Sequence, residues 1–162
     1  SVEDLVISKI GFAVQKGMPV PDISTPEKLK QVLLNAKSIA YSSSASGIYI
    51  KNELFKKLGI EKEIATKKIS ESGGGGIATG EAEVGFQQVS ELIYFKELDF
   101  LGTLPESVQQ TIFFSGALVE GSREQDAAKQ IAEKSGDWTY DPKIEVASCE
   151  IIEPCKTDTL DD

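Results

Sequence analysis

The residues best placed to do chemistry are the hydroxyl-bearing and small side chains of residues 42–54, whose sequence is SSSASGIYIKNEL. They follow a short apolar run at 38–41 and open a stretch in which apolar residues recur at helical spacing. The first turn of a helix carries free backbone N–H groups and the positive end of the helix dipole. Serine hydroxyls add donors without blocking a ligand. This pattern predicts a place to hold a small tetrahedral anion.

A plainer interpretation of the same serines stays open. Serine is favoured at helix N-caps whether or not a ligand is present, so the run could be an ordinary solvated cap segment. The serines concerned are Ser42, Ser43, Ser44 and Ser46. Tyr49, in the same segment, is expected to be a packing residue rather than a ligand contact.

The composition disfavours catalysis and metal binding. The sequence has no histidine, so it lacks the commonest general base and the commonest metal ligand, and a Ser-His-Asp triad is impossible. Three carboxylates, Glu81, Glu83 and Glu91, lie close together in sequence, but in a polar, turn-like context that offers no apolar pocket to raise a pKa. We therefore expect a non-enzymatic protein without a metal or cofactor.

Length and charge narrow the class of protein. The chain has 162 residues, of which 40% are hydrophobic and 27% charged, as in ordinary globular proteins. The net charge of −9 disfavours a nucleic-acid partner, and no apolar run reaches membrane-spanning length. Because the chain starts with serine rather than methionine, we expect a processed mature form or a fragment.

The elements that must position the serines alternate between strands and helices, which predicts an α/β fold. Thr25-Pro26 is typical of a helix start, and Leu58-Gly59 of a helix end with a glycine C-cap. Strands are expected at 4–14, 38–41, 64–69, 83–88, 98–101, 111–118 and 143–152, and helices after 25, at 46–58, near 90–92 and at 122–132.

Two short motifs leave alternatives. The four glycines at 73–76 could cradle a phosphate, but no Lys-Ser/Thr follows them, so a flexible turn is favoured. In the strand at 83–88, alternation predicts that one of Gln87 and Gln88 points inward and the other outward. At most one of the two glutamines is then expected to serve a site.

Several blocks carry a resemblance to a known family. The stretches PDISTPEKLKQVLLNAKSIAYSSSASGIYIKNELFKKLGI, GEAEVGFQQVSEL and FLGTLPESVQQTIFFSGALVEGSREQDAAKQIAE occur in the order and at nearly the spacing of the molybdate-binding protein family. These are type II periplasmic solute receptors of ABC importers. The similarity covers about residues 9–134. It implies a periplasmic-binding-protein type II-like lobe with a mixed sheet flanked by helices.

The resemblance also implies a site. In the family, hydroxyls and backbone amides hold an oxyanion between two lobes, with no positive side chain. By position, Ser46, Gly47 and Ile48 match an amide contact at a helix N-terminus, and Ser44 joins them. Gln88 stands where many relatives place a hydrogen-bonding side chain near the hinge. These five residues form the expected ligand-binding set.

Other parts of the chain depart from the family. By comparison with the family, we expect the N-terminal segment that supplies most of the first lobe to be missing, so the expected domain is 1–135, mostly second lobe plus hinge-returning segments. The acidic stretch 136–162 is unmatched and carries net −6 of the total −9. Its cysteines, Cys149 and Cys155, are expected to form a disulfide if the protein is exported.

The expected function is binding of a molybdate-like oxyanion as the solute receptor of an ABC importer, or a partial form of one. Molybdate, tungstate, sulfate and phosphate are the candidate anions, and the membrane component of an ABC transporter is the candidate protein partner. The expected location is periplasmic or extracellular. The alternative is a single-lobe interaction or inhibitory module that has lost transport function.

Overall fold

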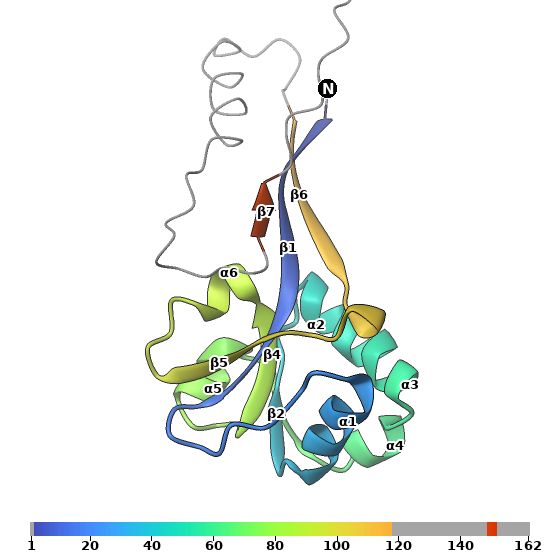
Figure 1. Ribbon diagram of the computed structural model, residues 1–162, viewed down its shortest axis with the longest axis vertical. Helices are drawn as coiled ribbons and strands as arrows, with labels where there is room; N and C mark the ends of the chain where they lie inside the picture. The colour runs from blue at the N-terminus through green and yellow to red at the C-terminus, as the bar shows by residue number, and fades with distance from the viewer. Residues whose placement is uncertain (1, 118–148, 152–162) are drawn as a thin grey trace, which may run out of the picture. The chain divides into compact units, whose positions relative to one another are not determined.

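The computed structural model describes residues 2–117 and 149–151, and the chain divides into two units (Figure 1). One unit is Lys9–Ile112, and the other comprises Ser1–Ser8 with Phe113–Asp162. The helix expected at 122–132 and Cys155 lie outside the described residues. The disulfide therefore stays a prediction.

A mixed sheet forms the centre of the unit Lys9–Ile112, with strand order β3-β2-β4-β1-β5. Strand β2, which lies between β3 and β4, runs parallel to both, whereas β1 is antiparallel to β4 and β5. The strands are β1 (Val2–Gln15), β2 (Ser38–Ala40), β3 (Lys68–Ser70), β4 (Val84–Gln88) and β5 (Leu98–Thr103). The predicted α/β fold with a mixed sheet flanked by helices is confirmed.

The second unit contains the beginning of β1 and most of β6 (Thr111–Ala117). The short strand β7 (Cys149–Ile151) pairs antiparallel with β1, and Val6 stands opposite Ile151. Only this part of the strand predicted at 143–152 falls within the described residues.

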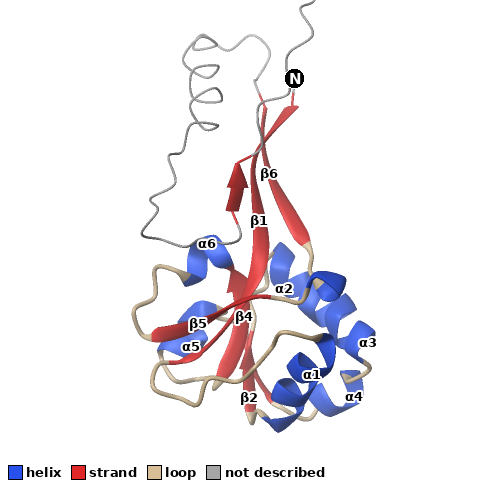
Figure 2. Cartoon of the chain, viewed as in Figure 1, coloured by secondary structure: helices blue, strands red, loops and turns tan. Residues whose placement is uncertain are grey.

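Helices cover both faces of the sheet, as Figure 2 shows. Phe12 and Ile39 belong to a buried cluster with the helices that follow β1 and β2, while their chain neighbours Ala13 and Ala40 belong to a second cluster. Neighbouring strand residues point to opposite faces, so two clusters mean two covered faces. In the first cluster the Phe12 and Phe86 rings pack edge to face, with their centroids 4.9 Å apart.

Helix α1 (Pro26–Asn35) begins where the sequence predicts. Thr25 Oγ1 accepts a hydrogen bond from the Lys28 N–H at 3.3 Å, which satisfies one free donor of the first turn. Leu29 and Leu33, four residues apart, are fully buried and lie on one apolar face of the helix.

The predicted helix at 46–58 is also present, although its middle is wound differently. Helix α2 (Ala45–Tyr49), the π-helix η1 (Ile50–Leu54) and α3 (Phe55–Leu58) follow one another without a break. Gly59 ends the segment with a φ of 62°, the left-handed conformation of a C-cap glycine.

Two local predictions were wrong. Residues 64–69 are not one strand, because α4 (Glu61–Ile64) comes before the short β3. The glycine run is not a flexible turn, because 74–76 begin helix α5 (Gly74–Ala78). A Cβ on Gly74 would lie 2.9 Å from Phe95 Cε2, and one on Gly76 would lie 2.4 Å from Ser70 Oγ. The glycines let the helix pack closely, which a glycine count alone does not reveal.

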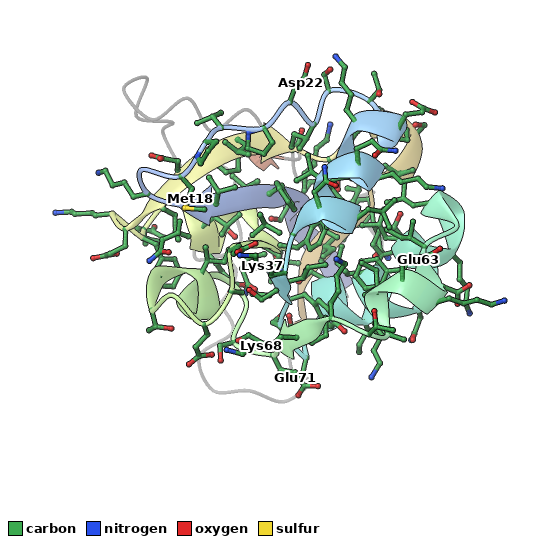
Figure 3. All side chains as sticks on the ribbon, turned by 90° about the horizontal axis from the view of Figure 1, so that it is seen from below. Met18, Asp22, Lys37, Glu63, Lys68 and Glu71 are labelled. Atoms are coloured by element: carbon green, nitrogen blue, oxygen red, sulfur yellow. The ribbon has the colours of Figure 1, made fainter. Side chains whose placement is uncertain are left out.

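The short helix predicted near 90–92 is present as α6 (Val89–Leu92). The 3-10 helix η2 (Glu106–Val108) was not predicted. Exposed carboxylates such as Asp22, Glu63 and Glu71 lie at the edge of the view in Figure 3. Across the described ranges, no helix is both long enough and apolar enough to cross a bilayer.

We expect Gly59→Ala to lower the free energy of unfolding by about 1 kcal/mol, because alanine is disfavoured at positive φ. Space is not the cause, since the nearest atom to an added Cβ, Lys30 Nζ, is 3.9 Å away. Urea denaturation measures the loss. Gly59→Asn is the control, because asparagine tolerates this conformation and should cost less. Equal losses in both variants would contradict the conformational explanation.

Candidate functional site

The serine-rich segment lies at one edge of the sheet, where three parallel strands end. Helices α2, α5 and α6 begin after β2, β3 and β4 respectively, so their first turns gather at the carboxyl ends of these strands (Figure 1). Ser42 and Ser72 form an isolated bridge that joins two of the loops. In open α/β sheets this edge is where ligands usually bind.

Three hydroxyls meet at this edge, and we call Ser42, Ser44 and Ser46 the serine rim. The Oγ atoms of Ser42 and Ser44 are 2.6 Å apart, and those of Ser44 and Ser46 are 3.4 Å apart. Ser44 is the N-cap of α2, yet within the described residues its side chain makes no cap hydrogen bond. Thr25 does make one at the start of α1. The first-turn N–H groups of α2 are therefore not capped by a serine side chain, in keeping with an anion site.

Gly47 holds the rim together through a close backbone approach. A Cβ at this position would lie 1.4 Å from the carbonyl oxygen of Ser42, so no other residue fits without moving the loop. Ser46 is buried, while the Ile48 side chain is 55% exposed. The Ile48 N–H donates to the Ser44 carbonyl at 2.9 Å, so this amide serves the helix. The structure thus brings Ser44, Ser46 and Gly47 together around one helix start.

Both glutamines at the end of β4 are buried, which corrects the expectation that one would face outward. Gln87 is 7% exposed and Gln88 is 5% exposed. The reason is that β4 lies inside the sheet with helices on both faces, so neither face meets solvent. In the part of the chain that is described, the Oε1 atoms of both side chains lack a hydrogen-bond partner.

Gln87 reaches the rim, a placement that the sequence did not single out. A Cβ on Gly73 would lie 2.0 Å from Gln87 Oε1 and 3.5 Å from Ser42 Cβ, so both groups border one point. Gln87 Nε2 donates to Glu91 Oε2 in the first turn of α6. The signal in the sequence was the pair of glutamines that ends the strand at 83–88, which does not say which of the two lies near the serines.

No positive side chain is among the hydrogen-bonding partners of the rim that the structure describes, and carboxylates lie near it. Burial raises the pKa of the Tyr41 phenol at the end of β2, and the negative charge of Glu71 raises it further. Tyr41 therefore stays neutral at physiological pH. An anion here would have to be held by neutral hydroxyls and backbone dipoles.

Tyr49 is a packing residue, as expected. Its ring is buried, and its hydroxyl donates to the Val108 carbonyl at 2.7 Å. The Lys57 ammonium donates to the same hydroxyl at 3.2 Å, which raises the pKa of Lys57. Across the described ranges, no three His, Cys, Asp or Glu side chains are grouped so that they could hold a metal ion.

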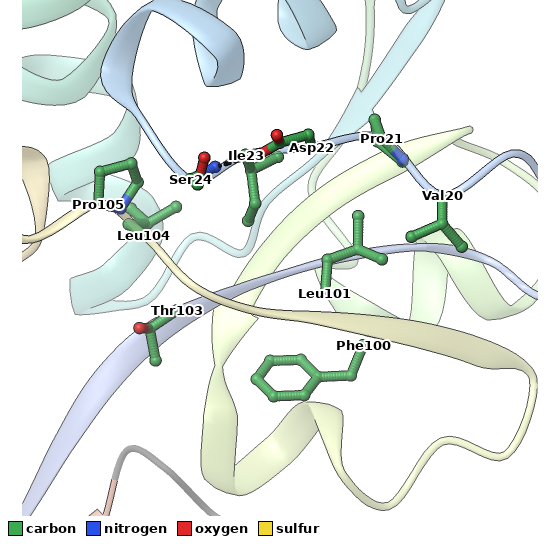
Figure 4. Close-up of a pocket in the computed structure, with 10 residues that line it drawn as sticks. All are labelled: Val20, Pro21, Asp22, Ile23, Ser24, Phe100, Leu101, Thr103, Leu104 and Pro105. Atoms are coloured by element: carbon green, nitrogen blue, oxygen red, sulfur yellow. Dashed lines mark hydrogen bonds between the residues drawn. The ribbon is translucent and has the colours of Figure 1, made fainter.

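A separate groove of about 510 Å³ lies between the loop before α1 and β5 (Figure 4). Most of its lining residues are apolar, and the side chains of Asp22 and Ser24 are already hydrogen-bonded. Asp22 accepts from the Ser24 N–H at 2.8 Å and from Lys28 Nζ at 2.6 Å, and the Lys28 contact holds the pKa of this carboxyl well below its usual range. None of the groove's lining residues belongs to the serine rim.

Comparison with known proteins fits this geometry. The family described as bacterial extracellular solute-binding protein matches residues 1–132. The chain belongs to this family. Since the family is extracellular, the expected periplasmic or extracellular location is supported at that level.

Individual relatives differ in what they bind. An aconitate isomerase from Pseudomonas sp is 40% identical over 131 residues, covering 79% of this chain and 50% of the relative. The chain therefore spans about half the length of that protein. The substrate-binding domain of a putative molybdenum ABC transporter from Clostridium difficile has a TM-score of 0.62 at 20% identity, covering 83% of this chain and 59% of that one. The effector-binding domain of a BenM variant has a TM-score of 0.55 at 16% identity, covering 96% and 68%.

These relatives confirm the type II solute-binding fold but correct one expectation. The inference that the chain is non-enzymatic was wrong, because the 40%-identical relative is named as an isomerase. That inference relied on the missing histidine and on the polar setting of the three glutamates. Neither excludes proton transfer, since carboxylates and other side chains also act as acids and bases.

We expect Gly47→Ala to destabilise the unit by about 2–3 kcal/mol, because the new methyl overlaps the Ser42 carbonyl and the loop must move. The denaturation midpoint measures this loss. Gly75→Ala is the matched control, since nothing lies within 4 Å of its added Cβ and alanine favours the helix. Similar losses in both variants would show that the close approach at Gly47 is not what holds the loop.

Proposed function

We propose that this chain supplies an anion-binding face of a solute-binding-family protein that acts on aconitate or a closely related tricarboxylate. The observation that carries the proposal is the serine rim at a helix start whose first turn is not capped by its own N-cap side chain. The 40% identity to an aconitate isomerase supports the choice of ligand and of an isomerase activity.

The donor set suits a carboxylate. Aconitate is an unsaturated tricarboxylate, and each carboxylate offers two oxygens that only accept hydrogen bonds when ionised. The rim offers hydroxyls from Ser44 and Ser46, together with first-turn amides that point along the helix dipole. Charge-assisted hydrogen bonds of this kind are about twice as strong as neutral ones. The role assigned to these residues is to bind one carboxylate and to fix its direction.

The second candidate function is that of a solute receptor of an ABC importer. Its ligand would be a tetrahedral oxyanion such as molybdate. The fold of the molybdenum-transporter domain and a rim without a positive partner among its described contacts support it. The expected set Ser44, Ser46, Gly47, Ile48 and Gln88 belongs to this candidate. The engaged Ile48 amide would leave the serines and the preceding amides as its donors.

Calorimetric titration with trans-aconitate, molybdate and sulfate separates the candidates. We expect trans-aconitate to bind at least tenfold more tightly than either tetrahedral anion. Proton NMR of aconitate incubated with the protein tests for the isomerase activity. Tighter binding of molybdate, without any conversion of aconitate, would favour the importer candidate instead.

We expect Ser44→Asp to weaken anion binding at least tenfold while leaving stability nearly unchanged. Aspartate is a good N-cap, so the helix start is preserved, but its charge occupies the place of the anion and repels it. Ser44 suits this test better than Ser46, because Ser44 is exposed and Ser46 is only 1% exposed.

Ser44→Asn is the matched control, since asparagine caps equally well and carries no charge. Its affinity for the anion should stay within about threefold of the unsubstituted chain, because no charge is added beside the anion. A tenfold loss would require a change of about 1.4 kcal/mol in the binding free energy. If Ser44→Asp also keeps its affinity, the anion does not bind at this helix start.

A further inference from the structure

The amide of Gln87 is a feature of the site edge that anion binding by serines does not explain. The side chain is 7% exposed, and within the described residues its Oε1 has no hydrogen-bond partner. Buried polar atoms are almost always paired, so an unpaired one calls for a specific reason. The missing partner has to be a donor, because an amide oxygen can only accept.

Glu91 fixes which way this amide faces. Gln87 Nε2 donates to Glu91 Oε2, and an ionised carboxylate has no proton to give in return. Turning the amide over would set its oxygen against the carboxylate oxygen. The hydrogen-bond network therefore assigns Nε2 to the Glu91 side and Oε1 to the opposite side.

That opposite side is the turn at Gly73, which also borders the rim residue Ser42. Gln87 Oε1 and Ser42 Cβ lie within 2.0 and 3.5 Å of the point where a Cβ on Gly73 would stand. Gly73 has a φ of 53° and no side chain, so the Gln87 oxygen packs directly against the backbone of this turn. A larger residue at position 73 would fill the space in front of the amide.

We propose that Gln87 is a specificity residue of this site, whose Oε1 accepts a hydrogen bond from an O–H group of the ligand. This inference rests on the proposed anion site. Within the proposed tricarboxylate class, the preferred ligand is one that carries a hydroxyl or keeps one acid group protonated, so aconitate with one protonated carboxyl group binds more tightly than the fully ionised form. Because Oε1 is buried, the turn at Gly73 must move aside for the ligand to reach it.

The reason for such a preference is an asymmetry between donors and acceptors. An anion that only accepts hydrogen bonds leaves Oε1 unpaired and brings negative charge towards it. An anion of the same skeleton with one O–H group pairs with Oε1 while its carboxylates pair with the rim. Sites built around a buried acceptor reject the analogue that lacks the donor.

Two pairs of probes isolate this preference. Citrate and tricarballylate share a tricarboxylate skeleton, and only citrate has a hydroxyl; phosphate and sulfate are both tetrahedral, and only phosphate retains a proton near neutral pH. We expect calorimetry on the chain at pH 7 to give affinities at least fivefold tighter for the donor-bearing member of whichever pair binds. Equal affinities within each pair that binds would overturn the proposal.

Variants then test whether Gln87 is the origin of the preference. Gln87→Met keeps the length of the side chain but removes the acceptor, so the affinity ratio within a pair should fall to about one. Glu91→Gln frees the amide to turn over and should lower the ratio in part. Glu81→Gln is the control, because Glu81 contacts Ser70 instead, and its ratio should match the unsubstituted chain.

A purely structural role for Gln87 gives a different result. Gln87→Met would then lower stability and leave the affinity ratio unchanged, which overturns the inference. If trans-aconitate binds but none of the four probes does, the inference about Gln87 is overturned, because citrate and phosphate carry the donor that it requires. If trans-aconitate and molybdate also fail to bind, the anion site itself and both proposals are removed. Binding with equal affinities for the two probes of a pair would remove only the inference about Gln87.

Discussion

The close approach of the Gly47 backbone to the Ser42 carbonyl is the contact on which the serine rim depends. It folds the loop after β2 back over the first turn of α2, so that three hydroxyls meet around one helix start. The parallel pairing of β2 with β3 and β4 then brings the next two loops to the same edge. Chain segments separated by some thirty residues thereby border one site.

Much of the fold follows from local sequence. Thr25-Pro26 and Gly59 set helix ends by chemistry that involves only their neighbours, so these boundaries are predictable. The helix at Gly74–Ala78 is not predictable in this way. Its glycines are required by close contacts with Phe95 and Ser70, which come near only when the chain folds. The burial of both Gln87 and Gln88 likewise depends on helices that cover the two faces of β4.

The site was predictable to the same extent. Ser44, Ser46 and Gly47 are neighbours in sequence, and their meeting at a helix start follows from the pattern. The contact of Gln87 with the turn at Gly73 does not, because it joins two loops through the order of the strands. Function was harder still, since one fold serves receptors and enzymes alike, and the isomerase relative could not be anticipated from the missing histidine.

An acidic chain that binds anions needs donors that carry no counter-charge of their own. With a net charge of −9, long-range attraction is unavailable to this protein, and nearby carboxylates such as Glu71 and Glu91 oppose an incoming anion. Neutral hydroxyls and helix-start amides act only at contact distance, where direction matters most. Such a site discriminates by geometry and by the match of donors to acceptors. The Gln87 Oε1 atom, oriented by Glu91 at the margin of the site, is consistent with this kind of discrimination. The donors of the rim recognise only the oxygens of a ligand, whereas this acceptor also distinguishes ligands that carry an O–H group.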